Sequence, residues 1–87
     1  MKSKIKTLDG KTIKVWTKGI VIPGFYVGTW RRDIFGSAIK FEDYGNRESQ
    51  HGWEIDHIVS VTKGGSDDIS NLQPLQWENN AKKQNRL

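Results

Sequence analysis

The sequence predicts a small α+β fold in a single domain. The chain has 87 residues, which is too few for a second domain. Its first half is rich in short β-type segments broken by glycine and proline, whereas residues 51–87 show the order strand, long loop, short strand and helix. We therefore expect residues 1–50 to form a β-rich extension that packs on a compact unit made by residues 51–87.

The first half carries turn signals between its β-type segments. KTLDGKTIKVW has an Asp-Gly turn signal followed by alternating residues, which predicts a β-hairpin. GIVIPGFYVG predicts two short strands around a turn at Pro23-Gly24. IFGSAIKFEDYG contains two short apolar pieces separated by Gly36-Ser37, and NRESQHG is a polar loop.

The second half places polar groups inside an apolar strand. WEIDHIV predicts a strand in which residues 53, 55 and 57 share one face and residues 54, 56 and 58 share the other. KGGSDD indicates a loop, NLQPL a short extended piece, and QWENNAKKQN a helix of good to fair helix formers. Asp56 and His57 lie between Ile55 and Ile58, and burial of such polar groups is costly unless they are hydrogen-bonded or coordinated.

Composition and charge narrow the function classes. The chain has no cysteine, which excludes disulfides and zinc sites with cysteine ligands, and no apolar run is long enough to span a membrane. Without a secretory signal, we expect a cytoplasmic protein of bacterial or phage type. Residues 1–50 hold ten Lys or Arg against five acids, and residues 51–87 hold four against five. This basic first half fits an anionic partner such as nucleic acid, or simply a solvated surface.

A set of spaced polar residues carries the strongest functional signal. Asn71 follows His57 by 14 residues, and Asn80 and Lys83 lie on the predicted helix, three residues apart. With the glycine-rich loop and SNLQPL, residues 53–83 resemble the HNH endonucleases, and WRRDIFGSAIKFEDYG resembles the lead-in of their compact, cysteine-free members. The resemblance implies a small ββα-metal (HNH) nuclease fold, here with an N-terminal β-hairpin extension. Two departures are the missing Cys-x-x-Cys pairs for a structural zinc and Asn80 where the family name has histidine.

The resemblance also implies a reaction and roles for these residues. The chain would be a metal-dependent DNA endonuclease or nickase, with His57 as the general base that activates water. Asp56 and Asn80 would hold one divalent ion, with Mg²⁺ favoured and Mn²⁺, Ni²⁺ or Zn²⁺ as alternatives, and no structural zinc is expected. Asn71 would brace the loop, and Lys83 would bind a phosphate. Double-stranded DNA is the expected partner, and the candidate DNA contacts are Arg31, Arg32, Lys63, Lys82 and the N-terminal lysines Lys2, Lys4 and Lys6.

Simpler readings compete with each assignment. Without the resemblance, His57 would be interpreted as a core histidine with its polar atoms hydrogen-bonded, and Asn71 as an ordinary loop residue. Asn79 is a rival for the ligand role of Asn80, and His51 is a further candidate ligand or a solvated side chain.

Other readings remain open for the acids and for the whole protein. Glu54 is expected at the surface, with support of a metal ligand as the alternative role. The acidic tip at Asp67 and Asp68 is expected to point away from DNA. The alternatives for the whole protein are a non-cleaving DNA-binding module of the same fold and a structure-specific RNA nuclease. A monomer and a homodimer are both open, and no membrane partner is expected.

Overall fold

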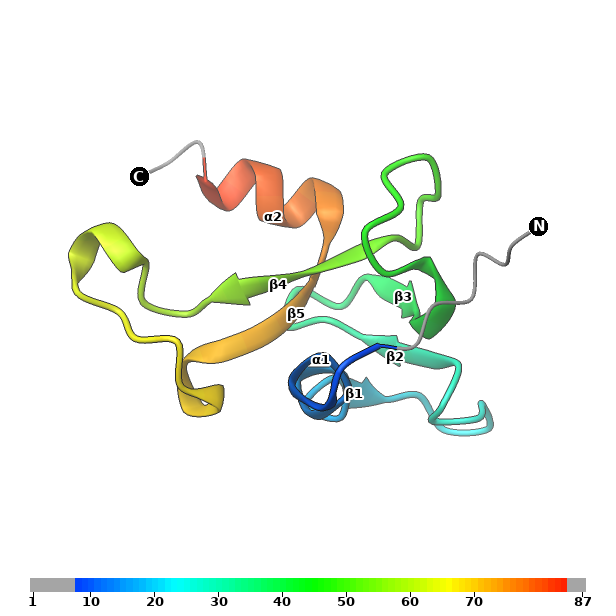
Figure 1. The fold of residues 1–87 in the computed structure, drawn as a ribbon. Coiled ribbons are helices and arrows are strands. Elements are labelled where there is room, and N and C mark those ends of the chain that lie inside the picture. Colours follow the sequence, from blue (N-terminus) through cyan, green and yellow to red (C-terminus); the bar gives the residue numbers. More distant parts are fainter. Residues whose placement is uncertain (1–7, 85–87) are drawn as a thin grey trace.

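The chain folds into a small α+β unit, shown in the computed structural model of Figure 1, which describes residues 8–84. Single 3₁₀ turns cover residues 41–43, 61–63 and 69–71. The helices and strands are α1 (Gly10–Trp16), β1 (Ile20–Val21), β2 (Trp30–Arg32), β3 (Ala38–Lys40), β4 (Trp53–His57), β5 (Leu72–Gln76) and α2 (Trp77–Gln84). Within residues 8–84, no helix is long and apolar enough to cross a membrane.

A helix replaces the predicted N-terminal hairpin, so the prediction of a β-hairpin at KTLDGKTIKVW is wrong. Asp9 is the N-cap of α1, and its Oδ1 accepts a hydrogen bond from the backbone N–H of Thr12 at 2.8 Å. Hydrogen bonds from the Thr12 side chain and, second, from its backbone lower the pKa of the Asp9 carboxyl. The buried residues Thr12, Val15 and Trp16 follow a helical period, which the apparent alternation concealed. Residues 1–7 of the basic N-terminus lie outside the described residues.

The segment after α1 forms an antiparallel sheet in the order β1-β2-β3. Only the first of the two strands predicted in GIVIPGFYVG forms, because the chain continues through turns from Pro23 to Gly28. The guanidinium of Arg31 donates to the carbonyls of Val27, Thr17 and Gly19 at 3.0–3.1 Å. Arg31 thereby fixes this turn region against the end of α1.

The predicted strand, loop, strand and helix are all present in the second half. β4 pairs antiparallel with β5, with Asp56 opposite Gln73 and His57 opposite Leu72. α2 starts directly after β5, where the Gln76 side chain accepts the backbone N–H groups of Glu78 and Asn79 at 2.9 and 3.1 Å. In Figure 1, α2 lies over one face of β4 and β5, and α1 lies on the other side.

The hydrophobic core takes residues from both halves of the chain. Its buried members are Val15, Trp16, Ile39, Trp53 and Leu72. The rings of Trp16 and Trp53 pack with their centroids 5.2 Å apart, and the indole N–H of Trp53 donates to the Phe41 carbonyl at 3.1 Å. The N-terminal segment is therefore part of the core that supports β4.

A buried carboxylate joins the β2–β3 turn to the start of α2. Asp33 is 1% exposed. Its Oδ1 accepts the backbone N–H groups of Phe35 and Ser37 at 3.0 and 2.9 Å. Its Oδ2 accepts the Gln76 backbone N–H at 3.0 Å and the Asn79 side-chain amide at 2.8 Å. Four donors thus compensate for the burial of one charge, and they set the position at which α2 begins.

Candidate active site

Asp56 is a buried carboxylate on the face of β4 that α2 covers. It is 1% exposed. Both of its oxygens lie 3.0 Å from Nζ of Lys83, and Oδ2 also accepts the Gln73 amide at 2.8 Å. Lys83 donates as well to the backbone carbonyl of His57 at 2.8 Å. The helix therefore brings a positive charge, not an amide, into contact with Asp56.

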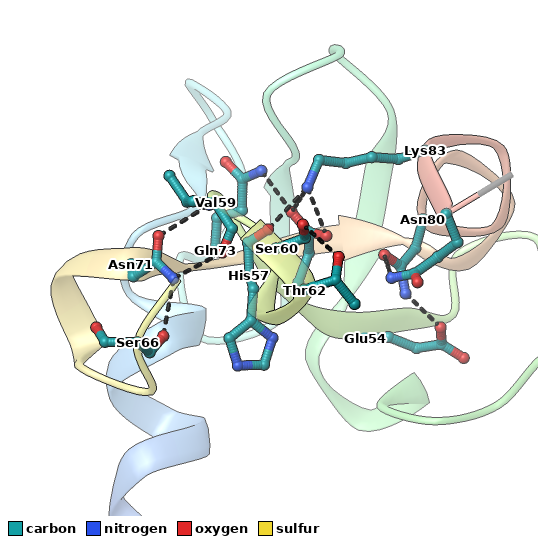
Figure 2. Close-up of polar contacts among 12 residues, drawn as sticks. Glu54, His57, Val59, Ser60, Thr62, Ser66, Asn71, Gln73, Asn80 and Lys83 are labelled. Atoms are coloured by element: carbon teal, nitrogen blue, oxygen red, sulfur yellow. Dashed lines mark hydrogen bonds and ion pairs between the residues drawn. The ribbon is translucent and has the colours of Figure 1, made fainter. Parts of the chain in front are cut away.

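His57 is the last residue of β4, and its ring points away from Lys83 (Figure 2). The pleat places it on the opposite face from Asp56, and the strand ends there, so both residues lie at one edge of the fold. Nε2 of His57 lies 2.7 Å from Oδ1 of Asp67, and contact with His57 lowers the pKa of the Asp67 carboxyl. No local sequence pattern indicates this contact, because Asp67 lies ten residues away in an irregular loop.

Asn71 closes the loop of residues 58–71 that follows His57. Its side-chain amide donates to the carbonyls of Val59 at 3.0 Å and Ser66 at 2.8 Å, and its oxygen accepts the Val59 N–H at 2.9 Å (Figure 2). Its backbone carbonyl accepts the Ile58 N–H at 2.7 Å. Gly65 packs beneath this bridge, because a Cβ there would lie 1.7 Å from the Val59 oxygen.

Asn80 is buried but contacts Glu54, not Asp56. Its Nδ2 donates to Oε1 of Glu54 at 2.9 Å, whereas its Oδ1 has only a 3.4 Å contact from Gln84. Glu54 in turn holds Arg47 through two bonds of 2.7 and 2.9 Å. These bonds, first that of Arg47 and then that of Asn80, lower the pKa of the Glu54 carboxyl. Glu54 is partly exposed, and its bond to Asn80 sets the orientation of the Asn80 amide.

The neighbouring asparagine has a different environment. Asn79 donates to Asp33 at 2.8 Å and to the Ser37 hydroxyl at 3.0 Å. Successive helix residues point about 100° apart, so Asn79 faces the β2–β3 turn while Asn80 faces β4. Asn79 therefore holds the helix in place and does not compete for contacts on β4.

The basic residues proposed to contact DNA fall into two groups. Arg31 and Arg32 are bound to backbone carbonyls of their own region, and the Arg32 guanidinium donates to Gly36 at 3.0 Å. Lys63 and Lys82 are exposed, on the loop after His57 and on α2. The Nδ1 atom of His51 lies 3.1 Å from the Ala38 carbonyl, and its ring packs edge-on against Trp30.

The oxygens at this site, not a cluster of acids and histidines, would have to hold a metal. Among residues 8–84, no group of three or more His, Asp or Glu side chains is placed to bind one ion. The available donors are the Asp56 carboxylate and the weakly engaged Oδ1 of Asn80. Hard oxygen donors suit Mg²⁺, which keeps several of its waters and needs few protein ligands. A buried carboxylate that already attracts a cation fits such a site.

The fold and the site together define a small α+β protein that gathers Asp56, His57 and Lys83 at one end of a two-stranded sheet. The HNH endonuclease family matches residues 39–86, which is more than half of the chain. The chain therefore belongs to the HNH endonuclease family, which comprises nucleases that act on nucleic acids. No curated protein and no solved structure matched the chain.

Proposed function

We propose that the chain is a metal-dependent DNA endonuclease or nickase that works inside the cell on double-stranded DNA. The observation that carries the proposal is the pair Asp56 and His57 at the end of β4. The Asp56 side chain faces α2, which carries Asn80 and Lys83, and the His57 ring points to the opposite side of the strand. In this proposal β4, β5 and α2 form the ββα-metal motif within residues 51–87. Residues 1–50 form an extension that packs beneath it. The family match supports nucleic acid as the substrate class.

His57 is the proposed general base. Its side chain is about one third exposed, so water and substrate can reach it. The ring nitrogen that Asp67 does not contact would take the proton from the attacking water. Asn71 acts on His57 through the chain, because its bonds to Val59 fix the backbone two residues beyond the ring.

Asp56 and Asn80 are the proposed ligands of one divalent cation, with Mg²⁺ favoured. Such a cation supplies a Lewis acid for the charge that develops on the phosphoryl and leaving oxygens. Glu54 supports the choice of Asn80, because it binds the amide nitrogen and leaves the oxygen free to face a cation. Lys83, whose ammonium already lies among oxygens, is the proposed phosphate contact once DNA is bound.

Exposed lysines are the proposed contacts to the DNA backbone away from the reacting group. Lys63 and Lys82 are free to reach phosphates, whereas Arg31 and Arg32 act on DNA only by adding positive charge near their own turns. Phosphate contacts orient a duplex without reading its sequence.

Nicking of supercoiled plasmid, measured beside DNA affinity, tests the proposal. Wild type should nick with Mg²⁺ or Mn²⁺ and stop with EDTA. His57→Ala should lower the nicking rate by about 10²–10⁴-fold and leave affinity nearly unchanged. His51→Ala, which changes the other histidine, is the matched control and should keep its rate. If wild type binds DNA but never nicks it with any of these metals, the protein is a binding module. Loss of affinity in His57→Ala would instead make His57 structural.

A further inference from the structure

Lys83 occupies the position on Asp56 that a metal ion would need. Its Nζ lies 3.0 Å from each carboxylate oxygen and 2.8 Å from the His57 carbonyl. These three oxygens match the three donors of an ammonium group. A positive centre surrounded by oxygens is also the arrangement that a hard divalent ion takes.

Burial makes this lysine necessary when the site holds no metal. Asp56 is 1% exposed, and an unpaired charge at that depth is strongly unfavourable. Gln73 contributes one neutral hydrogen bond of 2.8 Å, which does not compensate the charge. Among residues 8–84, the ion pair of Asp56 is the one with Lys83.

Lys83 and a divalent ion would compete for the position between the two Asp56 oxygens. Magnesium lies about 2.0–2.1 Å from its oxygen ligands, so an ion between the two Asp56 oxygens would meet the ammonium directly. Like charges at that separation repel strongly in a buried site. Lys83 is the penultimate residue of α2 and its side chain is about one quarter exposed. Its side chain can therefore move outward without unwinding the helix, because the backbone N–H of Lys83 bonds to a carbonyl of the preceding turn.

We propose that Lys83 is an internal cation that closes the metal site of the free protein and leaves Asp56 when a divalent ion binds. This inference rests on the proposed function only in taking Asp56 as a metal ligand. The released ammonium then has three free donors beside an incoming DNA phosphate. Metal binding and phosphate binding would be coupled through one side chain.

Calorimetric titration of metal-free protein with Mn²⁺ and Mg²⁺, without DNA, tests the exchange. The variant is Lys83→Met, which keeps the length of the stem and removes the charge. If Lys83 holds the site closed in about nine of ten molecules, the variant should bind Mn²⁺ about tenfold more tightly. Lys82→Met removes an exposed charge one residue earlier on α2 and should change the Kd little. An unchanged or weaker Kd in Lys83→Met, or no Mn²⁺ binding at all, overturns the proposal.

Thermal unfolding of the same proteins gives a second readout. Metal-free Lys83→Met should melt below wild type, because Asp56 loses its partner, and Mn²⁺ should raise its melting temperature more than that of wild type. Equal metal-induced shifts would contradict the exchange.

A measurement on wild type covers the case in which the variant does not fold. In NMR spectra selective for lysine ammonium groups, Lys83 should give a protected signal that Mg²⁺ removes. A signal that persists at saturating Mg²⁺ overturns the proposal.

Plasmid nicking distinguishes a failure of the exchange from a failure of the proposed nuclease function. If wild type nicks with metal but Lys83→Met binds Mn²⁺ with unchanged affinity, the nuclease function stands and the exchange is wrong. If Lys83→Met binds Mn²⁺ more tightly but no nicking is observed, the exchange stands and the nuclease function is wrong.

Discussion

The bridge made by Asn71 leads to a prediction that can be measured at one backbone amide. Asn71→Ala removes three side-chain hydrogen bonds of 2.8–3.0 Å to Val59 and Ser66. Each such bond contributes about 0.5–1.5 kcal/mol. Because these groups are exposed and water can replace Asn71, we take about 2 kcal/mol for the loop. The whole domain should have about 4–13 kcal/mol of unfolding free energy, so the variant should still fold.

Native-state hydrogen exchange should show this loss at Val59. Its N–H is bound to the Asn71 side chain, and about 2 kcal/mol corresponds to about 30-fold less protection. The Ile58 N–H is bound to the Asn71 backbone carbonyl, which alanine keeps, so Ile58 should lose less protection. Nicking should fall by about 10–100-fold, because the chain beyond His57 is no longer held.

The matched control is Asn46→Ala, which removes a single bond to the Glu48 N–H in another exposed loop. That variant should leave Val59 protection and nicking unchanged. Full protection of Val59 in Asn71→Ala would refute the bracing role. An equal loss of protection at core residues such as Ile39 and Trp53 would show that the substitution had destabilised the whole fold instead.

Three further predictions concern stability and DNA binding. Asp33→Ala leaves four donors without their acceptor and should lower the free energy of unfolding, measured with denaturant, by about 3–5 kcal/mol. Asn79→Ala should lower it by about 1–2 kcal/mol. Stability equal to that of wild type would contradict the stabilising role of the Asp33 hydrogen bonds. The pKa of Glu54 is held below its ordinary value of 4.5, so its stabilisation is full above that pH and is lost as pH falls through the lower, folded pKa. Melting temperatures should therefore fall less below about pH 4.5 in Glu54→Gln than in wild type, and parallel curves would exclude this source. Lys63→Gln and Lys82→Gln should each flatten the log–log dependence of DNA binding on salt by up to about 0.9; an unchanged slope would remove that lysine from the interface.

The strands and helix of the second half could be predicted because their signals are local. β4 shows a clear two-residue alternation, and the run before Gln84 contains helix formers without glycine or proline. α1 was missed because Asp9-Gly10 is equally suited to a hairpin turn and to the start of a helix. The burial of Val15 and Trp16 against Leu72 decides between them, and that contact is not visible in a local pattern.

Some contacts of the site could be predicted from local sequence patterns, and others could not. The strand period places Glu54 and Asp56 on one face of β4, and the helix period places Asn80 and Lys83 on one face of α2. The structure joins them as Glu54 with Asn80 and Asp56 with Lys83. The partners of Asp33 and the approach of Asp67 to His57 depend on how turns and loops fold back. Neither has a signal within a short window of sequence.

The shared core also determines what can be moved from this protein to another. Val15 and Trp16 pack against Leu72, and the ammonium of Lys18 binds the carbonyls of Ile69 and Leu72, near the end of the loop of residues 58–71. The strand–loop–strand–helix segment cut out alone would leave an apolar face in water and its loop unanchored. This segment therefore cannot be transferred by itself to another protein. A transfer would have to include α1 or redesign the surface that α1 covers.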